Sequence, residues 1–206
     1  MEKCAVVYMK IKNIVFDVGN VLVRWEPLEV INSAFPEFEA KEFYQKMYHT
    51  WIDLNLGKLT ENEAINHYHT NLEVSKERLS NFMLALKHHQ KPIDGSIALL
   101  KKLQKLDVNL FAITDNIKEI MDYHRRFSNF PKYFQDIIVS SDLGILKPDQ
   151  RIYRYLLDKH KLNAHESVFI DDVPVNVQGA IAVGMEAFQF IDSEACEKKL
   201  MSLLER

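Results

Sequence analysis

Four apolar runs in this 206-residue sequence each lead to side chains that could carry out chemistry. "IVF" leads into Asp17, "VNLFAI" into Thr114, and "SVFI" into Asp171 and Asp172. The remaining run, "DIIVS", is followed by "SDLGILKPD", which contains Lys147. Any one of these side chains alone would more often be a turn or capping residue than a catalyst. Carboxylates, a hydroxyl and an ammonium that recur after successive apolar runs indicate one functional site.

The chemistry that these residue types suit is phosphoryl transfer. Asp17 and Asp172 offer the hard oxygen ligands that Mg²⁺ prefers. An ionised Asp17 can attack phosphorus and form an aspartyl-phosphate, which water then hydrolyses. The transition state spreads negative charge over the equatorial oxygens, so positioned donors and cations provide most of the catalysis. Thr114 offers a hydroxyl for this purpose and Lys147 a positive charge.

The elements that must position these residues are predicted to be strands of a parallel sheet. The four runs are continuous and rich in β-branched residues, which is typical of strands buried on both faces. "EAFQFI" indicates one more strand, and helical patterns over 95–106, 148–160 and 174–184 lie between the runs. Alternating strands and helices predict an α/β fold with a doubly wound parallel sheet, whose ligands bind at the carboxyl ends of the strands.

Residues 24–92 interrupt this alternation, because a crossover between parallel strands needs only about a dozen residues. Helices are predicted over 27–34, 39–55, 60–71 and 75–88. Thr60 and Glu63 have the spacing of a capping box at one helix start. The predicted domains are therefore a catalytic core, residues 10–23 and 93–206, and an inserted helical bundle, residues 24–92, which we call the cap.

The motifs around these residues resemble those of the haloacid dehalogenase (HAD) superfamily of hydrolases. They occur in the family's order as "FDVGNVL", "AITDN", "LGILKPD" and "VFIDDVPVNVQGA". The pattern is most similar to the α-D-glucose-1-phosphate phosphatase-like subfamily, and also to the phosphatase domain of soluble epoxide hydrolases. This resemblance implies a Mg²⁺-dependent phosphatase for small phosphate monoesters, in particular sugar phosphates. It also implies that the cap closes over the site and selects the substrate.

The resemblance assigns a role to each motif residue. The implied metal ligands are Asp17, which is also the nucleophile, Asp172 with Asp171 beside it, and the backbone carbonyl of Gly19. The implied phosphate-binding residues are Thr114 and Lys147. We also expect Gly19 and Asp115 to lie in the substrate site. Lys147 is also implied in catalysis through its charge.

Two positions depart from the family pattern. Most phosphatases of the family carry a second Asp two residues after the nucleophile, where it protonates the leaving group, and here that position is Gly19. The second departure is Asp115, where the family commonly has Asn. A carboxylate there would either repel the phosphate or carry a proton, and we expect that Asp115, or a residue from the cap, partly replaces the missing acid. The alternative is that Asp115 caps a helix that starts near Ile117.

Weaker candidates lie outside the four motifs. Substrate contacts are predicted at Arg24, Trp25, His49, Trp51 and Asn55, although packing or surface exposure explains each of them equally well. Asn176 lies four residues after Asp172 and is a candidate for orienting it.

Two other function classes stay open. A metal-independent 2-haloacid dehalogenase also uses an Asp nucleophile, but serines tend to occupy the positions of Asp171 and Asp172 in such enzymes. Two carboxylates facing Asp17 without a cation would repel it strongly. A non-catalytic or regulatory phosphate-binding protein is the other possibility, because Gly19 removes an acid while the nucleophile, the metal ligands and the lysine are kept.

The composition of the chain limits the partners and the cellular location that we expect for it. The net charge of −3, with both signs mixed along the chain, argues against nucleic-acid binding by phosphate neutralisation. No apolar run approaches the length of a membrane span. Two cysteines, Cys4 and Cys196, offer neither a disulfide framework nor metal-ligand spacing. We therefore expect a cytoplasmic protein with a small-molecule partner, a monomer or weak homodimer, and a dispensable leader at residues 1–8.

Overall fold

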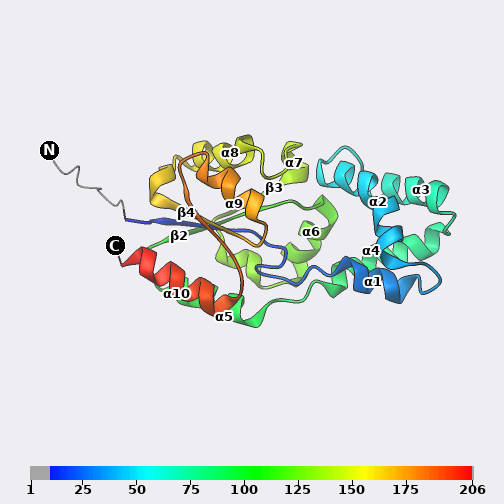
Figure 1. Cartoon of the computed structure of the whole chain (residues 1–206), viewed down its shortest axis with the longest axis horizontal. Coiled ribbons are helices and arrows are strands. Elements are labelled where there is room, and N and C mark those ends of the chain that lie inside the picture. The colour runs from blue at the N-terminus through cyan, green and yellow to red at the C-terminus, as the bar shows by residue number, and fades with distance from the viewer. Residues whose placement is uncertain (1–9, 206) are drawn as a thin grey trace.

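Five parallel strands form one sheet in the computed structural model, which describes residues 10–205 (Figure 1). The strands are β1 (Asn13–Phe16), β2 (Asn109–Thr114), β3 (Asp136–Val139), β4 (Ser167–Asp171) and β5 (Glu186–Gln189). Their order across the sheet is β3-β2-β1-β4-β5, so the three strands that deliver Asp17, Thr114 and Asp171 are adjacent. The predicted leader, residues 1–8, lies outside the described residues.

Alternate residues of each strand pack against helices on opposite faces of the sheet. In register, Ile14 pairs with Leu110 and Val168. These residues belong to the apolar cluster that contains α5 (Asp94–Leu103) and α10 (Ser193–Leu204). The next residue, Val15, belongs to the cluster that contains α8 (Gln150–His160) and α9 (Pro174–Ile181). Burial on both faces explains the continuous apolar runs and confirms the doubly wound α/β class.

Further helical segments of the core lie between β2 and β4. They are α6 (Lys118–Phe127), α7 (Ser140–Leu143) and two short 3₁₀ segments, Phe130–Tyr133 and Ala164–Glu166. The predicted helix over 95–106 was too long, since α5 ends at Leu103 and Leu106 is 44% exposed. The third apolar run also ends earlier than predicted, because Ser140 already belongs to α7. At Leu106 the apolar helical pattern continues past the turn that ends α5, whereas at Ser140 the chain passes directly from β3 into α7.

The inserted segment folds into four helices at one end of the sheet, on the right in Figure 1. They are α1 (Pro27–Ala34), α2 (Ala40–Asn55), α3 (Glu61–Leu72) and α4 (Lys76–His89). Phe35, Phe43, Tyr68 and Phe82 are buried in a cluster of their own, as the aromatic content of the segment predicts. The Thr60–Glu63 capping box is present with both of its reciprocal hydrogen bonds. The bundle therefore has its own apolar core.

Two features join the bundle to the sheet. The segments that enter and leave it lie side by side, because Val23 bridges to both Gly19 and Pro92. From the core, Ile117 and Ile120 at the start of α6 pack into the apolar cluster of the bundle. We propose that the bundle is a separate cap domain over residues 24–92, with this pair of segments as its only covalent link within the described chain.

Candidate functional site

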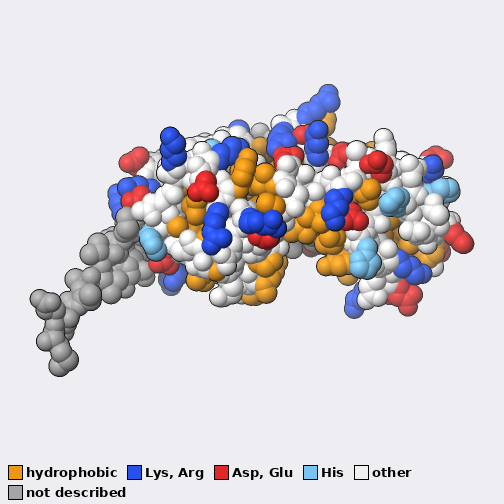
Figure 2. Space-filling model, turned by 90° about the horizontal axis from the view of Figure 1, so that it is seen from above, with side chains coloured by type: hydrophobic (Ala, Val, Ile, Leu, Met, Phe, Trp, Pro, Cys, Tyr) orange, Lys and Arg blue, Asp and Glu red, His pale blue; other side chains and the backbone are white. Residues whose placement is uncertain are grey.

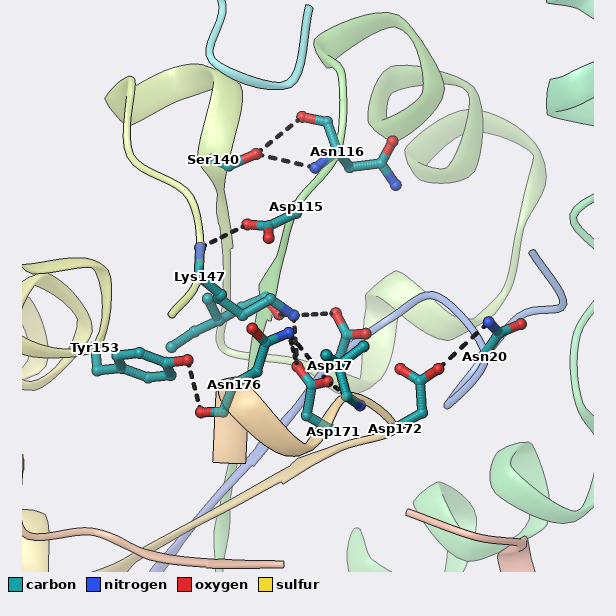
Figure 3. Close-up of polar contacts among 12 residues, drawn as sticks. Asp17, Asn20, Asp115, Asn116, Ser140, Lys147, Tyr153, Asp171, Asp172 and Asn176 are labelled. Carbon is teal, nitrogen blue, oxygen red and sulfur yellow. Dashed lines mark hydrogen bonds and ion pairs between the residues drawn. The ribbon is translucent and has the colours of Figure 1, made fainter. Parts of the chain in front are cut away.

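The predicted motif residues converge at the carboxyl edge of the sheet (Figure 3), and this edge faces the bundle in Figure 1. Asp17 follows β1, Thr114 ends β2 and Asp171 ends β4. Lys147 comes from the loop between α7 and α8, which follows β3. Parallel strands all present their outgoing loops at one edge, and this explains why residues 130 positions apart meet.

Lys147 is the buried centre of the site. Its Nζ donates to Asp17 Oδ1 at 2.6 Å and to Asp171 Oδ2 at 2.7 Å, and it also reaches the carbonyl of Ile113 at 3.3 Å. Burial alone would lower the pKa of Lys147, but the two carboxylates outweigh it and raise that pKa above its usual value. The ammonium therefore stays charged and fixes the two carboxylates on either side of it.

Asp17 has a different electrostatic balance. Burial raises the pKa of Asp17 to about 7, with Lys147 opposing this rise and the charge of Asp171 adding to it. A second positive charge beside Asp17 would favour its ionised form, which is the form that can act as a nucleophile. The electrostatics around Asp17 therefore favour the binding of a cation.

Asp171 is fully buried and both of its oxygens have partners. Oδ2 accepts from Lys147, and Oδ1 accepts from the backbone N–H of Val173 at 2.8 Å. The Asn176 side chain donates to both oxygens, at 3.2 and 3.1 Å. The expectation that Asn176 orients Asp172 was therefore wrong, because the first turn of α9 places its amide against Asp171.

Asp172 is half-buried and faces Asn20, whose Nδ2 lies 3.4 Å from its Oδ2 (Figure 3). Asn20 has a φ of 52° and accepts from the backbone N–H of Trp25 through Oδ1. It was missed in the sequence, although an Asn directly after Gly is a signal for a left-handed turn residue. Asn20 thus holds the turn after β1 against the end of β4.

The three carboxylates fit a hard divalent cation. One oxygen each of Asp17, Asp171 and Asp172 lie within 4.8 Å of one another. Oxygen donors at the end of a cavity suit Mg²⁺, and Gly19 lines the same cavity. Of the three aspartates, Asp172 has the most exposed side chain, whereas Asp171 already accepts hydrogen bonds from Lys147 and Asn176.

Asp115 is half-buried and holds the loop that carries Lys147. Its Oδ1 accepts from the backbone N–H of Lys147 at 3.0 Å. Burial raises the pKa of Asp115, while Lys147 opposes the rise. The alternative role as a helix cap was wrong, since the N-cap of α6 is Ile117, with no side-chain cap, and its N–H bonds to Asn116.

Ser140 connects the bundle to the core and was also missed. Its hydroxyl donates to the backbone carbonyl of Asn55 at 2.7 Å and accepts from the backbone N–H of Asn116 at 3.0 Å. Next to it, Gly57 packs so closely that a Cβ there would lie 2.1 Å from the carbonyl oxygen of Ser141. A buried serine has no characteristic sequence pattern, so only its neighbours in space show this role.

A cavity of about 510 Å³ opens above these residues, between the core and the bundle. Of the predicted substrate contacts, Trp25, Trp51 and Asn55 line it. Arg24 and His49 do not, and their side chains are exposed. Several further lining residues were missed in the sequence: Tyr44, Tyr48, Ile52, Gln90, Leu146, Val173 and Val175.

The family of the chain is decided by a family model that covers most of it. The model for haloacid dehalogenase-like hydrolases matches residues 14–190. The chain belongs to this family. The superfamily resemblance found in the four motifs is thus confirmed, and the chain is a hydrolase.

Three similar proteins place this HAD-family chain among its relatives. It is 23% identical over 197 residues to the sesquiterpene phosphatase astK of Aspergillus oryzae, covering 94% of this chain and 96% of that one. It is 27% identical over 198 residues to flavin mononucleotide hydrolase 1 of Arabidopsis thaliana, covering 94% and 78%. A HAD-family enzyme of Bacteroides thetaiotaomicron, solved with magnesium and inorganic phosphate, superposes with a TM-score of 0.71 at 18% identity, covering 87% and 93%.

Proposed function

We propose that this hydrolase is a Mg²⁺-dependent phosphatase of small phosphate monoesters that works through an aspartyl-phosphate at Asp17. The observation that carries the proposal is the buried lysine between two carboxylates, with Asp172 beside them at the base of a cavity. The names of two relatives, a phosphatase and a flavin mononucleotide hydrolase, support the choice of phosphate esters.

In the proposed reaction, Asp17 attacks the phosphorus atom of the ester. A bond forms between its carboxylate oxygen and phosphorus, and the bond from phosphorus to the ester oxygen breaks. The alcohol leaves with a proton, and water then attacks the acyl-phosphate to release inorganic phosphate and restore the carboxylate. Lys147 stays charged throughout and stabilises the charge that develops on the transferring group. We propose that Thr114, at the end of β2, donates its hydroxyl to a phosphate oxygen.

We propose Asp17, Asp172 and the backbone carbonyl of Gly19 as the residues that hold Mg²⁺. When bound, the ion supplies positive charge that keeps Asp17 ionised and neutralises the phosphate. Asp171 acts mainly through Lys147, because both of its oxygens already accept hydrogen bonds from the protein. Asn176 in turn orients Asp171.

The leaving group needs a proton, and Gly19 cannot provide it. We propose that Asp115 is the replacement acid, since its pKa is raised by burial and it lines the cavity. Its hydrogen bond from the backbone of Lys147 occupies one oxygen and leaves the other for a proton.

Sugar phosphates, the substrate class predicted from the subfamily resemblance, are one candidate for the ester. The activity is tested with a panel of sugar phosphates, nucleotides and p-nitrophenyl phosphate, each assayed with Mg²⁺ and with a chelator. The wild type is compared with Asp17→Asn and with Asp142→Asn, which removes an exposed carboxylate of α7 outside the cavity.

We expect Mg²⁺-dependent phosphate release by the wild type and by Asp142→Asn, and none by Asp17→Asn. Hydrolysis that survives either the chelator or Asp17→Asn would contradict the mechanism. Halide release from 2-haloacids without metal would instead identify a dehalogenase. Phosphate binding without turnover would identify a non-catalytic protein.

A further inference from the structure

The charged side chains of the cavity are concentrated at its base. Asp17, Asp115, Lys147 and Asp172 account for all the ionisable acidic and basic side chains that line it within the described residues. Lys147 is the one cationic member, and both its carboxylate partners are at the base with it. With Mg²⁺ bound as proposed, the base can receive one phosphate, and the walls that the structure describes offer no cation for a second anionic group on the substrate.

The walls and mouth of the cavity are mostly apolar. Trp25 stacks on Trp51 with ring centroids 5.4 Å apart, on the bundle side. At the mouth, Tyr48 of α2 is 49% exposed, and Val175 at the start of α9 is 57% exposed. The other apolar lining residues are Tyr44, Ile52, Leu146, Pro148 and Val173.

The amide side chains of the cavity are mostly occupied by the protein itself. Asn20 bonds to Trp25 and Asp172, and Asn116 bonds to Ile117. Likewise, the Gln90 side-chain oxygen bonds to His124 Nε2 at 2.8 Å, and the Asn176 amide bonds to Asp171.

Asn55 is different, because its Oδ1 is buried with no hydrogen-bond partner in the described chain. The amide nitrogens of Gln90 and Asn116 and the phenol hydroxyls of Tyr44 and Tyr48 also have no side-chain partner in the described chain, so free polar groups are present but scattered among the apolar walls. A polyhydroxylated leaving group would have to leave hydroxyls unpaired against apolar walls, which opposes its binding.

We propose that the substrate is the phosphate monoester of an apolar alcohol, aliphatic or aromatic, whose carbon skeleton lies between the aromatic wall of the bundle and Val175. This inference rests on the proposed phosphatase function and narrows its substrate class. It favours burial of apolar surface in the walls over hydrogen bonding to a sugar.

The test compares esters of primary alcohols, so that leaving-group reactivity differs little. 2-Phenylethyl phosphate and hexyl phosphate are compared with glucose 6-phosphate by kcat/KM, with Mg²⁺ present. We expect kcat/KM for the two apolar esters to be at least about tenfold higher, as burial of several methylene groups predicts. An equal or higher kcat/KM for glucose 6-phosphate would overturn the inference.

Two variants at the mouth of the cavity and one control test whether Tyr48 and Val175 contact the carbon skeleton of the substrate. Tyr48→Ala and Val175→Thr should each lower kcat/KM for hexyl phosphate, by about fivefold and about twofold, with a smaller effect on glucose 6-phosphate. The control, Leu84→Ala, removes an apolar side chain of α4 that is 47% exposed and does not line the cavity. It should match the wild type on both esters, and an equal loss from all three variants would contradict the assignment.

p-Nitrophenyl phosphate separates failure of this inference from failure of the proposed function. Its activated leaving group requires no acid, so its turnover shows that Asp17 and Mg²⁺ function, and the preference between hexyl phosphate and glucose 6-phosphate is read separately. Turnover of this ester with a preference for glucose 6-phosphate would overturn the apolar substrate class and leave the phosphatase standing. No Mg²⁺-dependent turnover of any ester would overturn both.

Discussion

At the scale of single residues, the site depends on one buried cation shared by two carboxylates. The side chain of Lys147 is 2% exposed and that of Asp171 is fully buried. Charges so far from water are stable only when they are paired, and the removal of one partner leaves the other uncompensated. The same pairing that positions Asp17 therefore also contributes to folding.

Lys147→Met tests this dual role. The variant leaves Asp17 and Asp171 facing each other without a cation, so we expect a loss of about 3 kcal/mol in the free energy of unfolding, measured by urea denaturation at pH 7. Lys147→Met combined with Asp171→Asn removes one of the unpaired charges and should recover part of that loss while activity stays absent. Unchanged stability in the single variant would contradict the buried pairing.

The Asp115 carboxylate is the proposed source of the leaving group's proton. Because burial raises its pKa, the protonated form should be lost as the pH rises through that pKa, and the rate should fall with it. Asp115→Asn should therefore remove the basic limb of the pH–rate profile for an unactivated alkyl phosphate. An unchanged basic limb would show that another group donates the proton.

Gly19 leaves room for the side chain that the family normally has there. A Cβ at this position would meet only the Cβ of Trp25, at 3.8 Å, which is an ordinary contact. Gly19→Asp should therefore fold and raise kcat for hexyl phosphate by about tenfold or more, since general acids contribute factors of about 10² to 10⁴. The isosteric Gly19→Asn carries no acid and should show no gain; equal rates for the two variants would contradict the explanation.

At the scale of elements, the turn after α2 determines how the bundle meets the core. Gly57 has a φ of 66° and lies against the backbone of Ser141 at the start of α7. Ser140 holds the same turn through the carbonyl of Asn55. This contact sets the position of α2, which carries Tyr48, Trp51 and Asn55 into the cavity.

Gly57→Ala should disturb this contact. The new Cβ would clash with a backbone oxygen, which cannot move away by side-chain rotation, so α2 must shift. We expect a raised KM and a loss of stability about 1–3 kcal/mol larger than for Gly144→Ala. Gly144 is the matched control, because its φ of 68° imposes the same left-handed strain while its nearest neighbour lies 3.7 Å away. Equal effects of the two variants would show that strain alone matters.

At the scale of the whole molecule, the two parts are joined through α6 as well as through the chain. His124 of α6 is fully buried, and its ring bonds to Gln90, at the end of α4, and to Ser128. Burial lowers the pKa of His124 to about 4. Both bonding partners are uncharged, so no neighbouring carboxylate compensates a protonated ring.

Because of His124, we expect the free energy of unfolding to fall in acid. The unfolded chain binds a proton at His124 with a pKa near 6.5, whereas the folded chain does so near 4. The contribution of His124 to the free energy of unfolding is therefore complete above pH 6.5 and is lost as the pH falls toward 4. It amounts to about 3 kcal/mol in total. Urea denaturation between pH 7 and pH 4 should show this slope, reduced in His124→Gln. The exposed His67→Gln should keep the wild-type slope.

The outer surface carries charges of both signs. Acidic and basic side chains are interspersed over the face shown in Figure 2. None of the helices in residues 10–205 combines the length and apolarity needed to cross a membrane. Cytoplasmic location, a monomeric or weakly dimeric state and the absence of nucleic-acid partners stay predictions.

The sequence by itself determined the sheet, the bundle and the motif residues of the site. Strands buried on both faces must be continuously apolar, and parallel strands must present their ends at one edge, so residue order alone predicts that Asp17, Thr114 and Asp171 meet there. The extent of α5 could not be read in this way, because an apolar residue such as Leu106 continues the helical pattern beyond the turn.

Only the tertiary structure decided which neighbouring side chains form hydrogen bonds with one another and which of them line the cavity. In the structure Asn176 donates to Asp171 rather than to Asp172, and Asp115 accepts from the backbone N–H of Lys147. Tyr48 and Val175 lie at the mouth of the cavity. These contacts join residues that lie far apart in the chain or differ by one position at a helix start. Residue type and spacing bring such groups to the same edge of the sheet, but hydrogen-bond partners depend on distances of a few tenths of an ångström, which only the packed structure determines.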